Sequence, residues 1–168
     1  MSAVSPTPPA IRQAGPPDHE PVWVVLEPMI RAGETYPLPR DMTRAAALAY
    51  WFAPHHTVFV AHDETHVLGT FYLKANQPGA GAHVANCGYV VHPEAQGRGI
   101  ARAMCRHSLD AARQRGFRAM QFNRVVATNT RAVALWQACG FSVVGRLPGA
   151  FVHPVHGEVD ALIMYQRL

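Results

Sequence analysis

This sequence of 168 residues has few cysteines and no long apolar run. Its three cysteines, Cys87, Cys105 and Cys139, are an odd number without close spacing, which argues against a disulfide framework or a zinc site. A reducing compartment suits them best. No apolar run approaches the roughly 18 residues of a membrane span, and the N-terminus lacks the basic and hydrophobic regions of a signal peptide. We therefore expect a cytoplasmic protein without a membrane partner.

Charge is also scarce, because only 15% of the residues are charged, whereas 49% are hydrophobic. Such a chain is too apolar to be disordered, and its length predicts one domain at about 150 residues per domain. The 15 basic residues exceed the 11 acidic ones by 4, and the excess is not gathered in a tail. This small excess suits an anionic small ligand better than a nucleic acid, for which no recognition-helix pattern is present.

The first 17 residues carry five prolines, which remove backbone donors and predict a flexible N-terminal tail over residues 1–17. A weak first strand near residues 10–14 is the alternative. Residues 18–168 are then the single folded domain.

Apolar periodicity in that domain predicts a mixed α/β fold. Val22, Val25, Leu26 and Met29 share one helical face, which Gly33 ends. A second helix, capped by Asp41 or Thr43, precedes a change to strand-like patterns. The second helix runs through Ala45, Leu48 and Phe52. The further elements are expected over residues 57–61, 67–73 and 84–91 (strands), 100–115 (helix), 117–123 (strand), 141–145 and 159–165 (strands), with a helix before residue 140 whose apolar face is Ala132, Leu135, Trp136 and Cys139. Gly88 inside the third strand indicates a bulge or a close approach of another backbone.

A glycine-rich turn, Gln96 to Ala101, lies between the third strand and the next helix. Small residues free several N–H groups there, and the positive end of the helix favours a phosphate or pyrophosphate. Arg98, Arg102 and Arg106 recur every four residues and would form a cationic stripe beside it. A tight turn with a solvated arginine face is the alternative. The turn is not a Walker loop, because no Gly-Lys-Ser/Thr follows.

Two runs of this sequence resemble the motifs of a known family. CGYVVHPEAQGRGIARAMCRHSL is similar to the acetyl-CoA-binding motif of the GCN5-related N-acetyltransferases (GNAT), with Gln96, Gly99 and Ala101 in its fixed positions. NTRAVALWQACGF, which begins at Asn129, resembles the second motif of that family. The resemblance implies an α/β fold whose mixed central sheet splays open at the acetyl-CoA site and is flanked by helices. It also implies an acyltransferase that uses acetyl-CoA as cosubstrate and no metal.

The resemblance further implies which residues hold the cosubstrate. The pantetheine arm is expected on the third strand, the pyrophosphate on the amides that follow it, and the asparagine of the second motif on the arm. The residues concerned are Tyr89, Val90, Val91, Gln96, Gly97, Arg98, Gly99, Ile100, Ala101, Arg102 and Asn129. From the residues alone, Asn129 is equally an N-cap of the helix that it opens, and the two roles are compatible.

Two ionisable groups common in the family are absent. Trp136 occupies the position where relatives often have a tyrosine that protonates the leaving thiolate, so Trp136 is interpreted as packing. The third strand also lacks the glutamate that many relatives use as a base. A base acting through water, or uptake of an amine that is already neutral, remains the inference.

Asn86 and Asn123 are the candidate catalytic residues. The stretch FNRVVATNTRAVALW, with Gly145-Arg146-Leu147-Pro148 after it, resembles a subgroup that includes fungal acetyltransferases acting on azetidine-2-carboxylate. That resemblance implies that the two asparagines hold the acceptor and position the reacting groups, facing each other across the cleft. Structural amides that tie strands together are the alternative.

The acceptor site is expected at Glu34 and Tyr36, in the loop between the first two helices. His153 and His156 are candidates for the acceptor mouth, although surface histidines are commoner. We expect an N-acetyltransferase that acylates a small-molecule amine, such as an amino acid, an imino acid or a toxic analogue, in a detoxifying role. The alternatives are a protein or peptide N-acetyltransferase and a non-catalytic acyl-CoA-binding module. Edge strands near the C-terminus suggest a homodimer by analogy with the fold.

Overall fold

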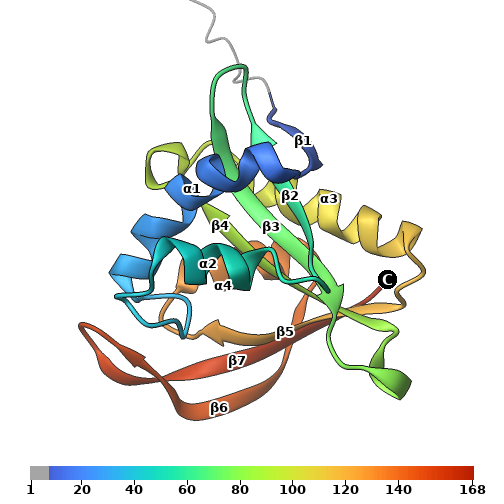
Figure 1. Ribbon diagram of the computed structural model, residues 1–168. Helices are drawn as coiled ribbons and strands as arrows, with labels where there is room; N and C mark the ends of the chain where they lie inside the picture. The colour runs from blue at the N-terminus through green and yellow to red at the C-terminus, as the bar shows by residue number, and fades with distance from the viewer. Residues whose placement is uncertain (1–7) are drawn as a thin grey trace, which may run out of the picture.

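A mixed β-sheet with helices on both faces organises the chain, in a computed structural model that describes residues 8–168 (Figure 1). The sheet has seven strands in the order β1-β2-β3-β4-β5-β7-β6. All neighbouring strands are antiparallel except β4 and β5, which are parallel. The elements are β1 (Ala10–Gln13), α1 (His19–Ala32), α2 (Arg44–Trp51), β2 (Thr57–His62), β3 (Val67–Ala75), β4 (Val84–Val91), α3 (Ile100–Gln114), β5 (Ala119–Val126), α4 (Thr130–Ala138), β6 (Ser142–His153) and β7 (Gly157–Arg167). The predicted α/β class with a mixed, helix-flanked sheet is confirmed.

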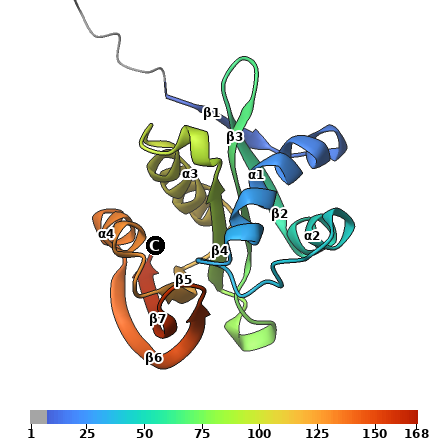
Figure 2. The ribbon, with the colours of Figure 1, turned by 90° about the vertical axis from the view of Figure 1, so that its left-hand side faces the viewer.

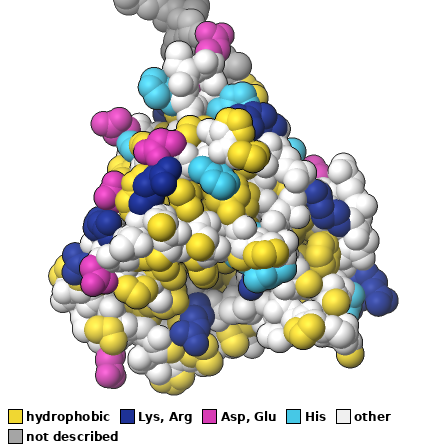
Figure 3. Space-filling model, viewed as in Figure 1, with side chains coloured by type: hydrophobic (Ala, Val, Ile, Leu, Met, Phe, Trp, Pro, Cys, Tyr) yellow, Lys and Arg dark blue, Asp and Glu magenta, His cyan; other side chains and the backbone are white. Residues whose placement is uncertain are grey.

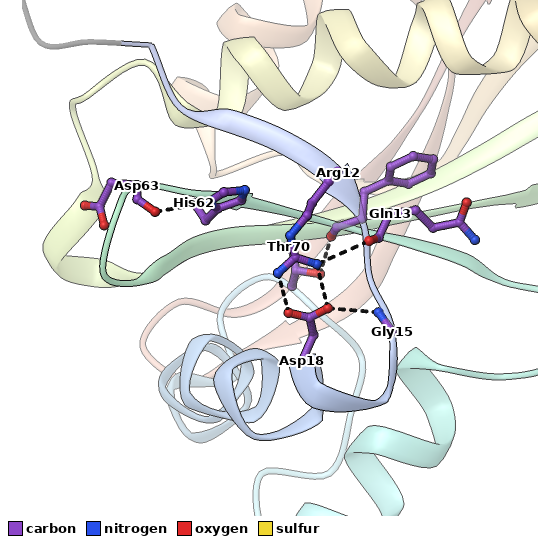
Figure 4. A network of polar contacts seen from close by, with 8 residues as sticks. Arg12, Gln13, Gly15, Asp18, His62, Asp63 and Thr70 are labelled. Carbon is purple, nitrogen blue, oxygen red and sulfur yellow. Dashed lines mark hydrogen bonds and ion pairs between the residues drawn. The ribbon is translucent and has the colours of Figure 1, made fainter.

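The predicted tail is too long, because residues 10–17 belong to the folded domain. β1 pairs with β2, and Arg12 donates two hydrogen bonds of 2.8 Å to the carboxylate of Asp18 just before α1 (Figure 4). The same carboxylate accepts the Gly15 N–H at 2.8 Å. The weak strand expected near residues 10–14 is therefore present, whereas residues 1–7 of the predicted tail lie outside the described residues.

Helices α1 and α2 cover one face of the sheet. Val22, Val25 and Leu26 are buried, as the helical spacing predicts, and Gly33 ends α1 in the left-handed conformation with φ of 67°. Thr43 is the cap of α2, because its side chain accepts the Ala46 N–H. These helices form a core cluster with side chains from β2, β3 and β4.

Helices α3 and α4 lie on the opposite side of the strands from α1 and α2 (Figure 2). The buried residues Met104, Cys105 and Ala112 of α3 join a second core cluster with side chains from β3, β4, β5 and β7. None of the described helices is long and apolar enough to cross a membrane.

The sheet splays between its two parallel strands. Strands β4 and β5 pair only at Val84 with Ala119 and at Ala85 with Met120, and then separate. The side chain of Asn86 makes the next tie, donating to the Gln121 carbonyl at 2.9 Å. Beyond it, the β4 edge that faces β5 has no strand partner, so the fold opens a gap at the centre of its sheet.

The last hairpin is longer than the sequence predicts. The predicted strands cover only residues 141–145 and 159–165, but β6 continues to His153 and β7 begins at Gly157. Register shifts lie between Val143 and Gly145 and between Leu147 and Phe151. These irregularities interrupt the alternating pattern, which is why the predicted strand covers only the first four residues of a much longer one.

Candidate active site

The free edge of β4 presents backbone groups to the gap. The N–H of Asn76 bonds to Val84 O and the N–H of His92 to Leu68 O, so the even-numbered residues of β4 pair with β3. Since hydrogen bonds alternate along a strand, the N–H and C=O groups of Tyr89 and Val91 face β5. No strand pairs with them there, because β4 and β5 have already separated. The gap therefore offers backbone donors and acceptors to an extended ligand.

Two cavities meet at this edge. The first, which we call the tyrosine cavity, has a volume of about 530 Å³ and includes Tyr36, Tyr50 and Tyr72 in its walls. The second, the glycine cavity, has a volume of about 620 Å³ and includes Gly97 and Gly99. Both volumes are in the usual range for small-molecule sites. The residues that line both cavities, called the junction below, are Glu34, Thr35, Tyr89, Val91, Gln96, Asn129, Ala132 and Trp136.

The glycine cavity has the features of an anion site. Gly97 and Gly99 both have φ of 77°, which a side chain would strain, and Gly99 is the N-cap of α3. No side chain caps this helix, so its first N–H groups stay available to a ligand. Arg102 and Arg131 line the cavity, and neither forms an ion pair within residues 8–168.

Nine of the eleven residues predicted for the cofactor line the glycine cavity, and two do not. Val90 lines only the tyrosine cavity, and its backbone pairs with β3. Arg98 lies 3.8 Å from Asp63 and lines neither cavity, so the predicted arginine stripe contributes only Arg102. The nine that the structure brings together are Tyr89, Val91, Gln96, Gly97, Gly99, Ile100, Ala101, Arg102 and Asn129.

Gly88 permits the tight packing of the tyrosine cavity. A Cβ at this position would lie 2.7 Å from Tyr36 Oη and 2.7 Å from Tyr72 Cε1. The β3–β4 register is continuous here, so the glycine marks a close approach of two side chains and not a bulge. Tyr36 donates to the Tyr89 carbonyl at 3.2 Å, and burial raises the pKa of its hydroxyl well above the usual value. Tyr36 is therefore a permanent donor near neutral pH.

Asn86 and Asn123 line the same tyrosine cavity but do not bond to each other. Asn86 is buried, and its nitrogen donates to the Gln121 carbonyl, which fixes the amide orientation. Its Oδ1 has no hydrogen-bond partner among residues 8–168. Asn123 is exposed and accepts from Gln121 Nε2 at 2.9 Å while donating to Asn76 at 2.7 Å. Both asparagines thus tie strands or loops together, as the structural alternative expects, and both face the cavity.

Aromatic packing separates the two cavities. Trp136 lies 4.9 Å from the ring of Tyr89 and 5.2 Å from that of Phe122, which agrees with its interpretation as packing. Ser108 donates to the Cys105 carbonyl, so the 2.6 Å contact between Tyr89 Oη and Ser108 Oγ has the tyrosine as donor. Burial raises the pKa of Tyr89 well above the usual value, which makes its phenol a structural group rather than an acid for catalysis.

Asn129 has the capping role that its position predicts. Its Oδ1 accepts the Ala132 N–H at 3.2 Å, and the residue lies at the junction. Its Nδ2 donates to no group of the described residues, so capping leaves a donor for a ligand. The two roles that the sequence leaves open are therefore compatible in the structure.

The cysteines and histidines offer neither a nucleophile nor a metal centre. Burial raises the pKa of the Cys87 thiol to about 12, so it stays protonated. Within residues 8–168, no three His, Cys, Asp or Glu side chains are grouped to hold a metal ion. His153 and His156 stack on each other with ring centroids 4.6 Å apart and line the glycine cavity, not the tyrosine cavity.

Several lining residues were not predicted from the sequence. Tyr50, Tyr72, Lys74 and Arg124 line the tyrosine cavity, and Arg131 lines the glycine cavity. Tyr72 lies on the predicted strand over residues 67–73 and Lys74 directly after it, and only the placement of α1 and α2 shows which face of β3 stays open. The predicted Glu34 lies at the junction and Tyr36 in the tyrosine cavity.

Comparison with known proteins gives consistent relatives. Residues 23–141 match the acetyltransferase (GNAT) family. N-acetyltransferase aca1 of Schizosaccharomyces pombe is 33% identical over 151 residues, covering 80% of this chain and 72% of that protein. A GCN5-related N-acetyltransferase from Kribbella flavida is 41% identical with a TM-score of 0.90, covering 95% of this chain and 97% of that chain. The putative acetyltransferase yncA from Salmonella typhimurium, solved with its cofactor acetyl-CoA, shares the fold at 21% identity and a TM-score of 0.84, over 96% of this chain and 95% of that chain.

Proposed function

Because the chain belongs to the acetyltransferase (GNAT) family, we propose that it transfers the acetyl group of acetyl-CoA directly to the nitrogen of a small-molecule amine. The observation that carries this proposal is the junction, where two cavities meet at the unpaired backbone groups of β4. One cavity has the chemistry for a phosphorylated ligand, and the other has the size of a small acceptor.

Acetyl-CoA fits the glycine cavity by its chemistry. The N–H groups at the start of α3 and the side chains of Arg102 and Arg131 suit its phosphates. The unpaired backbone groups of Val91 suit an amide of its pantetheine arm, which would lie along β4 as an added strand, whereas the Tyr89 carbonyl already accepts from Tyr36. In this proposal Gln96 and Asn129 border the arm, whereas Val90 and Arg98 have no direct role.

The reaction needs an ordered amine and a donor for the charge that develops on the thioester oxygen. The Tyr89 N–H faces the gap and is the donor that we assign to that oxygen. The C–N bond forms as the C–S bond breaks, and water at the open junction removes the amine proton and protonates the thiolate. Asn86 and Asn123 orient the acceptor, with Glu34 and Tyr36 at the side of the cosubstrate.

The shape of the tyrosine cavity favours a small acceptor over a peptide. Its volume of about 530 Å³ suits an amino acid, an imino acid or a toxic analogue. Pro37, from the proline-rich loop between α1 and α2, forms part of its wall. Proline fixes the backbone of this loop, which limits its opening for a polypeptide. Inactivation of a toxic amine is the biological role that this acceptor class suggests.

The test is release of free CoA thiol from acetyl-CoA with a panel of amines at neutral and alkaline pH. The panel holds cyclic imino acids, phosphinothricin-like amino acids, polyamines, aminoglycosides and short peptides. Turnover with one class of small amine is the expected result. Turnover confined to peptides would replace the acceptor class. Saturable acetyl-CoA binding without turnover of any amine would favour a binding module instead.

A further inference from the structure

The tyrosine cavity contains two positive side chains that no acidic residue neutralises. Lys74 and Arg124 line it, and neither forms an ion pair with a carboxylate of residues 8–168. Glu34 is the only acidic residue among those that line this cavity. Lys74 is also the only lysine of the chain, since the other 14 of its 15 basic residues are arginines. The cavity wall thus carries a surplus of positive charge.

Lys74 lies near the end of β3, where α1 and α2 no longer bury this face of the sheet. It is directly opposite Asn86 in the β3–β4 register, so the two side chains share a face of the sheet. Two residues earlier on the same face, Tyr72 is buried in the core cluster of α1 and α2. At Lys74 the strand becomes partly exposed. Lys74 is therefore on the same face as the buried Tyr72 but at the end of β3 that solvent reaches.

Arg124 reaches the same cavity because β5 is irregular. Phe122 pairs with Met164 and Val125 with Leu162, so Asn123 and Arg124 stand opposite the single residue Ile163. Such a bulge breaks the alternation of side chains along a strand and commonly re-aims them. Asn123 and Arg124 are consecutive, and both line the tyrosine cavity.

The charges are separated along the cavity. Glu34 lies at the junction, whereas Lys74 and Arg124 line only the tyrosine cavity. Along β4, the step from Tyr89 to Asn86, the neighbour of Lys74, covers three residues, or about 10 Å. An acceptor with opposite charges at its two ends would therefore place its nitrogen at the junction and its anionic group at the other end.

We infer that Lys74 and Arg124 bind a carboxylate of the acceptor and so select amino or imino acids over simple amines. This inference rests on the proposed function and adds the specificity site to it. Tyr36, Tyr50 and Tyr72 line the cavity and provide apolar surface for the body of such a molecule. A carboxylate satisfies the two cations, which a neutral amine would leave unpaired.

The first experiment compares matched acceptors. Initial rates of CoA release are measured for amino and imino acids and for their carboxamides, such as proline and prolinamide. We expect kcat/KM for the preferred acid to exceed that for its amide at least 30-fold, on the order of 2 kcal/mol at about 1.4 kcal/mol per factor of ten. Equal kcat/KM values for acid and amide would overturn the inference but leave the proposed function in place.

Variants that remove one positive charge test whether Lys74 and Arg124 cause the preference for the acid over its amide. Lys74→Gln and Arg124→Gln are each expected to reduce the acid-to-amide ratio of kcat/KM about tenfold or more, mainly through KM. Lys74→Arg, which keeps the charge, should retain most of the ratio. Arg118→Gln removes the same charge from an exposed residue just before β5 that lines neither cavity, and serves as the control. A ratio unchanged by Lys74→Gln and by Arg124→Gln would contradict the assignment.

A second measurement does not depend on turnover. Because Lys74 is the only lysine, trinitrobenzenesulfonate labels this side chain and the N-terminal amine, which peptide mass mapping separates. With CoA present, at least one acid of the panel should slow the labelling of Lys74 while its amide does not. If no acid protects Lys74 better than its amide, the inference fails whether or not the enzyme is active.

Discussion

The two sides of the splayed sheet are built differently. On the side of β1–β4, every residue of β3 from Leu68 to Leu73 is buried, between α1 and α2 on one face and α3 on the other. On the side of β5–β7, β6 has a single buried residue, Phe151, and α4 has none. The side of β1–β4, called the scaffold below, is therefore covered on both faces. The side of β5–β7, called the wall below, is partly exposed.

The candidate site lies at the gap between β4 and β5, where the two sides meet; we call this gap the seam below. Each side contributes different chemistry: β4 and the start of α3 give backbone donors, while β5 and α4 give Asn123, Arg124 and Asn129. On the face that Figure 3 shows, hydrophobic side chains gather across the middle, and Lys and Arg side chains stand apart from one another. That surface suits a small ligand in a cavity and not a long polyanion.

The largest effect, on acetyl-CoA affinity, is expected from a negative charge placed in the glycine cavity on the scaffold side. Gly99→Glu places a carboxylate at the end of the glycine cavity that we propose for the phosphates, so acetyl-CoA affinity should fall more than about 100-fold by like-charge repulsion and lost space. Calorimetric titration with acetyl-CoA measures the loss, and thermal melting measures the cost to the fold.

Gly116→Glu is the matched control at the other end of α3. Gly99 has φ of 77° and Gly116 has φ of 82°, and a Cβ at either position meets nothing within 4 Å. Both variants therefore bear similar strain and the same charge. Equal acetyl-CoA affinity in the two variants would remove the assignment of the glycine cavity.

The sequence alone predicts the scaffold side better than the wall. The helical spacing of Val22, Val25 and Leu26 and the alternating strands are local patterns that burial enforces, and the structure contains them. In β6 the register shifts around Gly145 and Leu147 interrupt that pattern, so most of its length is not visible. The strand β1 is short and exposed on most of its residues, which leaves almost no periodicity to read.

The site divides in the same way. The glycine turn and Asn129 lie in contiguous motifs, so their residues can be read from the sequence. Lys74 and Arg124 reach the tyrosine cavity through a cross-strand register and a bulge, which are tertiary features without a local signal. Arg98 is the opposite case. Its place in the motif predicts a ligand contact, but in the structure it lies 3.8 Å from Asp63 and lines neither cavity.

The contrast in burial predicts different responses to one substitution. Val60 in β2 is 0% exposed and Val152 in β6 is 73% exposed. Val60→Thr buries a hydroxyl and should lower the free energy of unfolding by about 1–3 kcal/mol. Val152→Thr should change it by less than about 0.5 kcal/mol. Urea unfolding of both variants measures the difference, and similar losses would show that β6 is covered in solution.

Within the scaffold side, the buried Asp18 should contribute more acid sensitivity than an exposed carboxylate. Arg12 and the Gly15 N–H hold the pKa of Asp18 below its usual value in the folded state. This stabilisation is present above the unfolded pKa of about 3.9 and is lost as the pH falls through the lower folded pKa. Asp18→Asn should cost about 1–2 kcal/mol at pH 7 and flatten the stability profile below pH of about 4.

Asp110→Asn is the exposed counterpart of that change. Asp110 pairs with Arg113 at 3.1 Å, but its side chain is 70% exposed, so the pair is screened by solvent. Urea unfolding from pH 2 to pH 7 should show little difference from the parent protein. Comparable losses in the two variants would mean that the Asp18 network does not anchor β1.

Modest effects on stability are expected at the seam itself, where variants of the two asparagines distinguish a structural role from a functional one. Asn86→Ala leaves the Gln121 carbonyl without its donor and should cost about 1 kcal/mol. Asn123→Ala removes exposed contacts and should cost a few tenths of a kcal/mol. If Asn123 orients the acceptor, kcat per folded molecule should nevertheless fall tenfold or more while the KM for acetyl-CoA stays unchanged. A normal kcat with a slightly lowered melting temperature would make Asn123 a tie between β5 and the loop after β3, and would place the orienting amide at Asn86 alone.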